Sequence, residues 1–166
     1  MPIKKLPRPV RFLLWLLVFA LVYFGAQQYQ KRNLVSGPVP DYSAPLLQGA
    51  YFDSRDLAGK PYVLHFWASW CPICRFEQDT IQALSRDHQV ISVAMQSGGR
   101  EEVQNYMQEA GLNFITLLDE EGRLASRFGV RGVPTTLLIN SDGEIAFREV
   151  GYTSEWGMRL RLWWMK

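Results

Sequence analysis

Residues 63–77, VLHFWASWCPICRFE, decide the fold of this chain. The stretch opens on a run rich in β-branched and aromatic residues, which is typical of a buried strand. The segment from Ser69 to Pro72 then bends the chain, and Pro72 suits the first turn of a helix, where a missing N–H costs nothing. The stretch therefore predicts a strand, a turn and a helix, with Cys71 at the N-terminus of the helix.

Both cysteines of the chain, Cys71 and Cys74, lie in this stretch. Unpaired N–H groups and the positive end of the helix dipole favour a thiolate at Cys71. Cys74 follows one turn later on the same helical face. This arrangement predicts a redox pair in which Cys71 attacks a disulfide and Cys74 resolves the mixed disulfide. The alternative is half of a zinc site, but His65 and His88 stand alone, so neither a metal nor a cofactor is predicted.

Residues 66–74 resemble the active-site segment of thioredoxin-fold proteins, and in particular of their membrane-tethered, extracytoplasmic TlpA/ResA-type branch. A second motif, residues 131–135, resembles the cis-proline loop of that family, and the resemblance covers residues 41–151. The Cys-Pro-Ile-Cys-Arg sequence and the N-terminal anchor are similar to the suppressor-of-copper-sensitivity type. The resemblance implies a protein-disulfide oxidoreductase with an α/β thioredoxin-like fold: a central mixed sheet flanked by helices, a TlpA-type insertion and one N-terminal transmembrane helix.

The rest of the chain carries patterns that suit this layered α/β fold. Apolar β-branched runs and helical spacing alternate after the cysteines, and Gly98-Gly99 and Ser141-Asp142-Gly143 mark turns. The predicted strands are 90–95, 114–118, 135–140 and 144–150, and the predicted helices are 71–86, 101–110, 120–128 and a last one capped by Thr153 or Ser154. In that last helix Trp156, Leu160 and Trp163 are expected to pack on the sheet, with a membrane contact as the alternative.

An uncharged apolar run, residues 12–26, follows four basic residues and precedes two more. It predicts a cytoplasmic N-terminus at 1–11, a transmembrane anchor at 12–29, a linker at 30–40 and a thioredoxin-like domain at 41–166. The charge distribution favours the N-terminus inside the cytoplasm and the rest of the chain outside it, and the family resemblance implies an inner-membrane protein with its domain in the periplasm. A cleaved signal peptide is the alternative, although no pair of small residues precedes a cut after Ala26.

The charges of the chain argue against nucleic-acid binding. The formal net charge is +2, but from residue 33 onward 12 basic residues face 16 acidic ones, a net of −4, so the basic excess belongs to the anchor. The family resemblance implies periplasmic partners that carry disulfides or thiols, and a transmembrane reductant of the DsbD type. The direction of electron flow is open, because an oxidising disulfide donor also uses Cys-Pro-x-Cys. A copper-binding or metallochaperone role, with Cu(I) on two thiolates, is a further alternative.

Two further positions are predicted to handle protons at the redox site. Cytoplasmic thioredoxins carry a buried aspartate where this chain has His65, while TlpA-like relatives carry a glutamate at the position of Glu77. Glu77 is a helical neighbour of Cys74, so it is the expected proton-handling group, and His65 is either a second one or a core histidine.

The substrate side of the predicted site combines the active-site turn with the proline loop. The resemblance implies a cis Val133–Pro134 bond whose backbone pairs with an extended substrate segment. Trp70 and Pro72 are expected to form an apolar rim around Cys71. Trp67 is expected to be a core residue.

Overall fold

The computed structural model describes residues 7–165 and contains two compact units, Met1–Arg32 and Asn33–Lys166. The first unit is the 24-residue helix α1 (Arg8–Lys31). Within Pro9–Lys31 an 18-residue window has a mean hydropathy of 1.9, so this helix is long and apolar enough to cross a membrane, a property that a signal sequence near the N-terminus shares. Of the predicted cytoplasmic segment 1–11, residues 1–6 lie outside the described residues.

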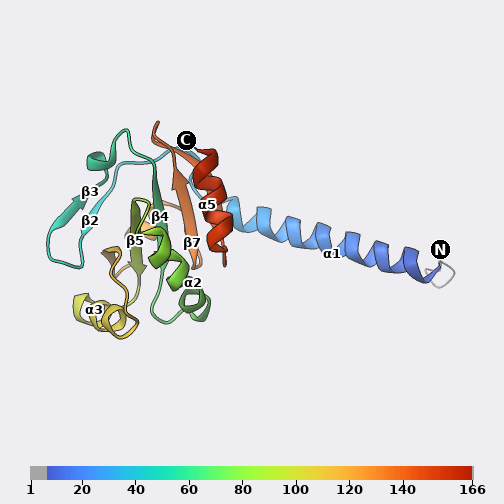
Figure 1. The fold of residues 1–166 in the computed structure, drawn as a ribbon, viewed down its shortest axis with the longest axis horizontal. Helices are drawn as coiled ribbons and strands as arrows, with labels where there is room; N and C mark the ends of the chain where they lie inside the picture. Colours follow the sequence, from blue (N-terminus) through green and yellow to red (C-terminus); the bar gives the residue numbers. More distant parts are fainter. Residues whose placement is uncertain (1–6, 166) are drawn as a thin grey trace. The chain divides into compact units, whose positions relative to one another are not determined.

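The second unit is built on a six-stranded mixed sheet (Figure 1). Two parallel pairs, β4 with β5 and β5 with β6, form one half, and antiparallel pairs of β4, β7, β8 and β1 form the other. In sheet order the strands are β1 (Gly37–Pro38), β8 (Glu144–Val150), β7 (Thr135–Ile139), β4 (Tyr62–Trp67), β5 (Val90–Met95) and β6 (Ile115–Asp119). The predicted mixed sheet is confirmed.

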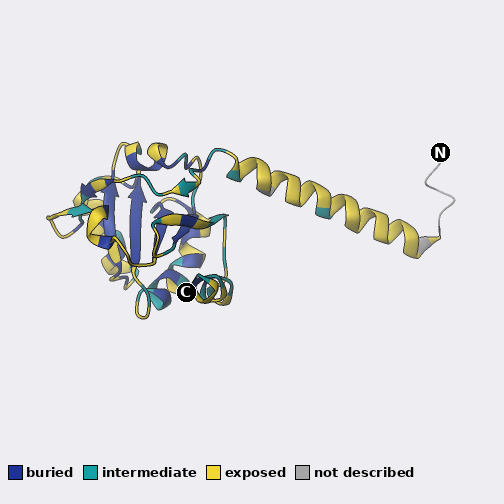
Figure 2. Ribbon diagram, turned by 90° about the horizontal axis from the view of Figure 1, so that it is seen from above, coloured by how far each residue is buried: buried dark blue, intermediate teal, exposed yellow. Residues whose placement is uncertain are grey.

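Helices cover both faces of this sheet, and each face has its own hydrophobic cluster. One face packs against α2 (Pro72–Leu84), α3 (Arg100–Glu109) and α5 (Glu155–Trp164). The other packs against α4 (Arg123–Arg127), the hairpin β2 (Ser43–Pro45) and β3 (Tyr51–Asp53), and the 3₁₀ helix η2 (Ser54–Leu57). Both clusters consist of residues from 34 onward, so the second unit has a core of its own (Figure 2).

The central strand β4 explains why the active-site stretch lies where it does. All six of its residues are buried, and they alternate between the two clusters, with Leu64 and Phe66 on one side and Val63 and Trp67 on the other. Trp67 is a core residue, as expected, and its indole N–H donates to Ser92 Oγ at 3.1 Å. The cysteines therefore lie just beyond the carboxyl end of a central strand of the sheet.

The segment predicted as a linker is bonded to the domain over most of its length. Leu34 is buried, Val35 N–H donates to the Phe128 carbonyl at 3.1 Å, and β1 extends the sheet beside β8. A glycine and a proline suit this place, because an edge strand tolerates a residue without an N–H donor. The chain thus enters the domain within three residues of the end of α1.

The expected packing of the last helix is wrong. The side chains of Trp156, Leu160 and Trp163 are 83%, 63% and 68% exposed, whereas Met158 and Leu162 are buried against the sheet. Helix α5 carries two apolar stripes, and only one of them can face the core. The smaller, more adaptable Met and Leu side chains fill the space beneath the helix. The helix does begin at a predicted cap: Gly157 N–H donates to Ser154 Oγ at 3.2 Å.

Candidate active site

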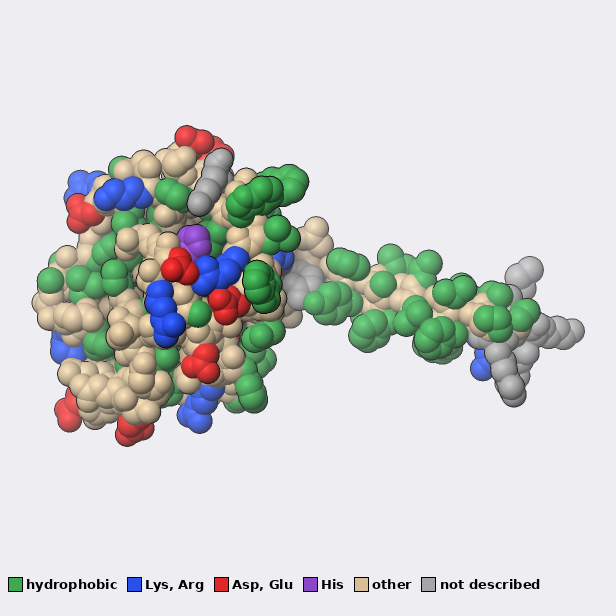
Figure 3. Space-filling view, in the orientation of Figure 1, with side chains coloured by type: hydrophobic (Ala, Val, Ile, Leu, Met, Phe, Trp, Pro, Cys, Tyr) green, Lys and Arg blue, Asp and Glu red, His purple; other side chains and the backbone are tan. Residues whose placement is uncertain are grey.

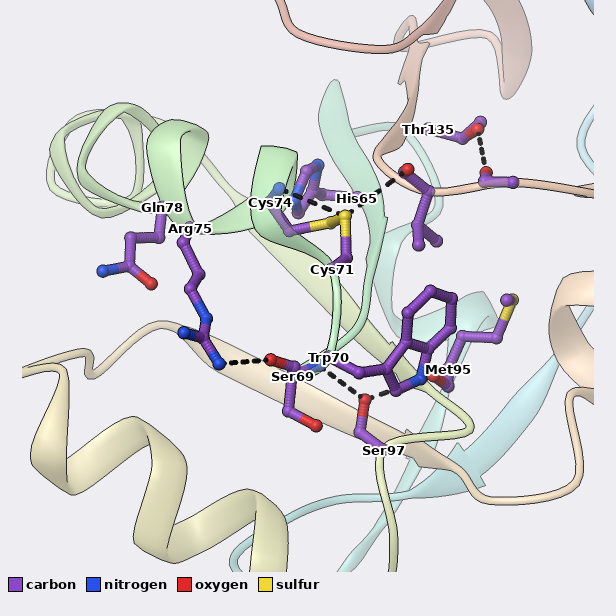
Figure 4. The surroundings of a disulfide bond; sticks show 12 residues. His65, Ser69, Trp70, Cys71, Cys74, Arg75, Gln78, Met95, Ser97 and Thr135 are labelled. Carbon is purple, nitrogen blue, oxygen red and sulfur yellow. Dashed lines mark hydrogen bonds between the residues drawn. A yellow bond between two sulfur atoms is a disulfide. The ribbon is translucent and has the colours of Figure 1, made fainter.

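Cys71 and Cys74 form a disulfide at the N-terminus of α2 (Figure 4). Cys71 is the N-cap residue of the helix, and Cys74 N–H donates to Cys71 Sγ at 3.2 Å. A backbone donor and the positive end of the helix dipole thus converge on the sulfur of Cys71, where they stabilise a thiolate once the disulfide is reduced. Both cysteine side chains are almost fully buried, so the N-cap position distinguishes Cys71 as the attacking sulfur.

The turn before Cys71 is held by the loop that follows β5. Ser69 N–H donates to Ser97 Oγ at 3.0 Å, and the Trp70 indole N–H donates to the Gln96 carbonyl at 2.9 Å. Gln96 adopts φ +48°, a left-handed conformation that non-glycine residues rarely take. Sequence reasoning missed this support, because the Gly98-Gly99 pair indicated a turn but not which carbonyl it would present.

The proline loop lies beside the disulfide, as the resemblance implied. The Val133–Pro134 bond is cis, and the Val133 carbonyl oxygen lies 3.5 Å from Cys71 Sγ. Two hydrogen bonds fix the loop: Thr135 Oγ1 donates to the Gly132 carbonyl at 2.8 Å, and Gly151 N–H donates to the Pro134 carbonyl at 2.9 Å. The fold therefore brings together two motifs that are about sixty residues apart in the chain.

Glu77 is fully buried on the face of α2 that carries Cys74. Its Oε1 accepts a hydrogen bond from Thr153 N–H at 2.7 Å, while Oε2 is buried without a hydrogen-bond partner. Burial raises the pKa of Glu77 from its ordinary 4.5 to about 7, and the Thr153 hydrogen bond offsets only part of this effect. The carboxyl group can therefore both accept and release a proton near neutral pH.

His65 is buried in β4, and its Nδ1 lies 2.9 Å from Thr136 Oγ1 on the neighbouring strand β7. Burial lowers the pKa of His65 to about 3, so the imidazole is neutral at physiological pH. His65 and Cys74 line one cavity of about 10 Å³, near the lower limit for a single water. Both predicted proton-handling residues thus lie on the Cys74 side of the site.

An exposed apolar rim surrounds the buried sulfurs. Trp70 and Pro72 belong to it, and Ile73 and Phe76 extend it along α2. Phe76 is 80% exposed and was missed. The buried stripe of α2 runs through Cys74, Glu77, Ile81 and Leu84, and this spacing leaves Phe76 on the outer face, so helical periodicity could have identified it. Within residues 7–165 no group of three or more His, Cys, Asp or Glu side chains is placed to hold a metal ion.

A Cys-x2-Cys disulfide at a helix N-terminus, faced by a cis-proline loop on a mixed α/β sheet, defines a thioredoxin-like thiol:disulfide oxidoreductase. The Redoxin family model matches residues 34–158, and the chain belongs to this family. The predicted fold and enzyme class are both confirmed.

Known relatives carry matching descriptions. The chain is 32% identical to a thioredoxin-like protein of Haemophilus influenzae over 98% of this chain and 96% of the relative. It is 30% identical to the thiol:disulfide interchange protein DsbE of Escherichia coli K12 over 80% and 75% of the two chains.

Solved structures of similar fold are also described as disulfide interchange proteins or disulfide oxidoreductases. A thiol:disulfide interchange protein of the thioredoxin family from Chlorobium tepidum superposes with a TM-score of 0.68 at 26% identity, covering 79% of this chain and 97% of the other. A secreted Mycobacterium tuberculosis disulfide oxidoreductase homologous to DsbE gives a TM-score of 0.63 at 28% identity, covering 73% and 95%. The chain is therefore a DsbE-like protein that exchanges disulfides through Cys71 and Cys74.

Proposed function

We propose that this protein is anchored in the inner membrane by α1 and reduces disulfides of periplasmic proteins, with electrons supplied by a transmembrane reductant of the DsbD type. The apolar helix, the basic residues around it and the DsbE-like relatives support this location. The observation that carries the chemistry is the position of Cys71 Sγ, between the N-terminus of α2 and the Val133 carbonyl.

The proposed cycle moves two electrons from the cysteine pair to the partner. The Cys71 thiolate attacks one sulfur of the partner disulfide, which breaks that bond and forms a mixed disulfide. Cys74 then loses its proton and attacks Cys71 Sγ. The Cys71–Cys74 disulfide forms, and the partner leaves with both of its sulfurs reduced and protonated.

Glu77 is the group that we assign to the proton of Cys74. It follows Cys74 by one helical turn on the same buried face, and its pKa of about 7 matches proton transfer at neutral pH. His65 has a pKa of about 3, so it takes up no proton at neutral pH. We therefore assign His65 a structural role through its contact with Thr136.

The partner is proposed to bind as an extended segment across the proline loop. The Val133 backbone supplies main-chain hydrogen bonds, and Pro134 keeps the loop next to Cys71. Trp70, Pro72 and the neighbouring Phe76 give apolar contacts that demand little of the partner's sequence. This mode suits an enzyme that acts on several proteins.

The reductive direction is supported by the balance of charges around the sulfurs. One backbone N–H and the helix dipole favour the Cys71 thiolate. Burial of both sulfurs and the nearby carboxyl group of Glu77 oppose it. A weakly stabilised thiolate makes the disulfide harder to reduce, so the reduced pair is the better electron donor. An oxidising disulfide donor is the alternative.

A relation to the suppressor-of-copper-sensitivity type stays a proposal that rests on Cys-Pro-Ile-Cys-Arg and the N-terminal anchor. Two thiolates are the ligands that this site can offer to Cu(I). Copper retained in equal amount to the reduced protein, without any disulfide exchange, would favour a copper carrier over the oxidoreductase that we propose.

Trapping of the mixed disulfide tests the proposed function. In cells, Cys74→Ala is expected to accumulate disulfide-linked complexes with periplasmic proteins, because the resolving sulfur is gone. Cys71→Ala is the matched control, which keeps one cysteine but loses the attacking one, and it is expected to trap none. If Cys71→Ala traps the same complexes, or if neither variant traps any, the assigned roles are wrong.

A further inference from the structure

Helix α5 exposes a face that the redox chemistry does not use. We call it the tryptophan face; its residues are Trp156, Leu160, Trp163 and Trp164. Their spacing of four, three and one places them on one side of the helix, opposite the buried Met158 and Leu162. Half of the six tryptophans of the chain lie there. Figure 3 shows hydrophobic side chains gathered along the edge of the domain where Figure 1 draws α5.

The arginines of α5 do not make this face a charged one, because both are held by acidic partners. Arg159 bonds to Glu155 at 2.8 Å and to Asp87 at 2.9 Å. Arg161 bonds to Glu149 on β8 at 3.0 Å. The tryptophan face is therefore apolar, and whatever covers it gains from burying indole rings rather than from pairing charges.

Strand β8 contacts both the segment by which the chain enters the domain and α5, which lie on opposite faces of the sheet. Arg148 on β8 donates to the Leu34 carbonyl at 3.2 Å, and the next residue, Glu149, holds Arg161 of α5. Leu34 is buried, and α1 ends at Lys31, so three residues, roughly 10 Å of chain, join the helix to the domain. If α1 spans the bilayer, this short connection keeps the domain within reach of the membrane surface.

We propose that the tryptophan face lies in the interface of the lipid bilayer and orients the domain on the membrane. This inference rests on the anchoring role proposed for α1. Trp and Leu on one face of a helix are the residues that favour the boundary between headgroups and acyl chains. The domain carries a net charge of −4, so attraction to anionic lipids is not the driving force, and binding is expected to vary little with salt.

Vesicle binding by the fragment 33–166 tests this inference, because the full chain would attach through α1 whatever α5 does. The fragment holds both hydrophobic clusters, so it has the core needed to fold. Flotation with phosphatidylcholine vesicles, with and without phosphatidylglycerol, gives the partition coefficient. We expect binding to both, and a loss of about tenfold for each of Trp156→Gln and Trp163→Gln, which corresponds to about 1.4 kcal/mol each. Tyr51→Ser, an exposed aromatic on β3, is the matched control and is expected to bind like the parent fragment.

The outcomes separate this inference from the proposed function. Thiol exchange of the fragment with a disulfide peptide is expected to be the same in all variants, since the tryptophan face is outside the redox site. A fragment that exchanges disulfides but does not float overturns the membrane contact and leaves the oxidoreductase intact. Binding that the tryptophan substitutions do not weaken, or that high salt abolishes, also overturns it. Dimers lost in Trp156→Gln, without flotation of the parent, would assign the face to a second copy instead.

Discussion

Replacing Glu77 by Gln changes how the stability of the oxidised domain depends on pH. In the folded protein the pKa of Glu77 is about 7, against an ordinary value of 4.5. Below the ordinary pKa the carboxyl group is protonated in both states and adds no penalty. Between the two values the folded state holds the proton that the unfolded state releases, so stability falls as pH rises, and the full penalty is reached above about 7. A shift of this size corresponds to about 3 kcal/mol.

Glu77→Gln is expected to remove this slope. The amide keeps the shape of the side chain and an oxygen that can accept from Thr153 N–H, but it does not ionise. Its NH₂ group has no acceptor where Oε2 lies, which costs a constant amount at every pH. The comparison is therefore between slopes and not between absolute stabilities.

Urea unfolding of the oxidised fragment 33–166, followed from about pH 4 to about pH 8, measures the effect. The wild type is expected to lose up to about 3 kcal/mol relative to the variant over this range. Glu109→Gln, a change at an exposed glutamate of α3, is the matched control and is expected to keep the wild-type slope. Equal slopes for the wild type and Glu77→Gln would refute the buried carboxyl group with a raised pKa on which our mechanism depends.

Glu77→Gln also has a kinetic test, and two further substitutions test other parts of the site. Glu77→Gln is expected to slow the resolving step about a hundredfold at neutral pH, measured by stopped-flow exchange with a disulfide peptide; an unchanged rate and pH profile would remove this residue from the mechanism. His65→Ala is expected to lower the free energy of unfolding by roughly 2 kcal/mol, because it leaves a cavity beside Thr136, while the pH profile of exchange keeps its shape; a shifted profile would restore His65 as a base. Trp70→Phe loses the hydrogen bond to the Gln96 carbonyl and is expected to cost about 1 kcal/mol in urea unfolding, so an unaltered midpoint would contradict a supporting role for that loop.

The parts of the fold that sequence predicted are those in which one local pattern has one physical solution. The apolar, β-branched run of β4 favours a buried strand, and Pro72 after Cys71 suits the first turn of a helix, so the redox pair could be placed at a helix N-terminus. The cis bond at Pro134 came from the family resemblance and not from spacing, since the chain elsewhere gives no sign of which proline is cis.

The parts that sequence did not predict depend on competition or on the backbone. Helix α5 has two apolar stripes of similar spacing, and only the packed fold decides that Met158 faces inward and Trp156 outward. The segment around Gly37 resembles a flexible tether in composition, yet it pairs with β8 because the edge of the sheet is open to it. The hydrogen bond from the Trp70 indole to the Gln96 carbonyl joins positions 26 residues apart. Every residue has a backbone carbonyl, so the residue type at position 96 does not indicate this bond.

The reduction potential of the Cys71–Cys74 pair tests the central claim most directly. The fragment 33–166 would be equilibrated with glutathione or dithiothreitol buffers, and the fraction of disulfide measured at each ratio. We predict a potential near that of thioredoxin, about −270 mV, because burial and Glu77 oppose the thiolate that the helix N-terminus favours. A potential near about −120 mV would contradict the reductive role and make this protein a donor of disulfides.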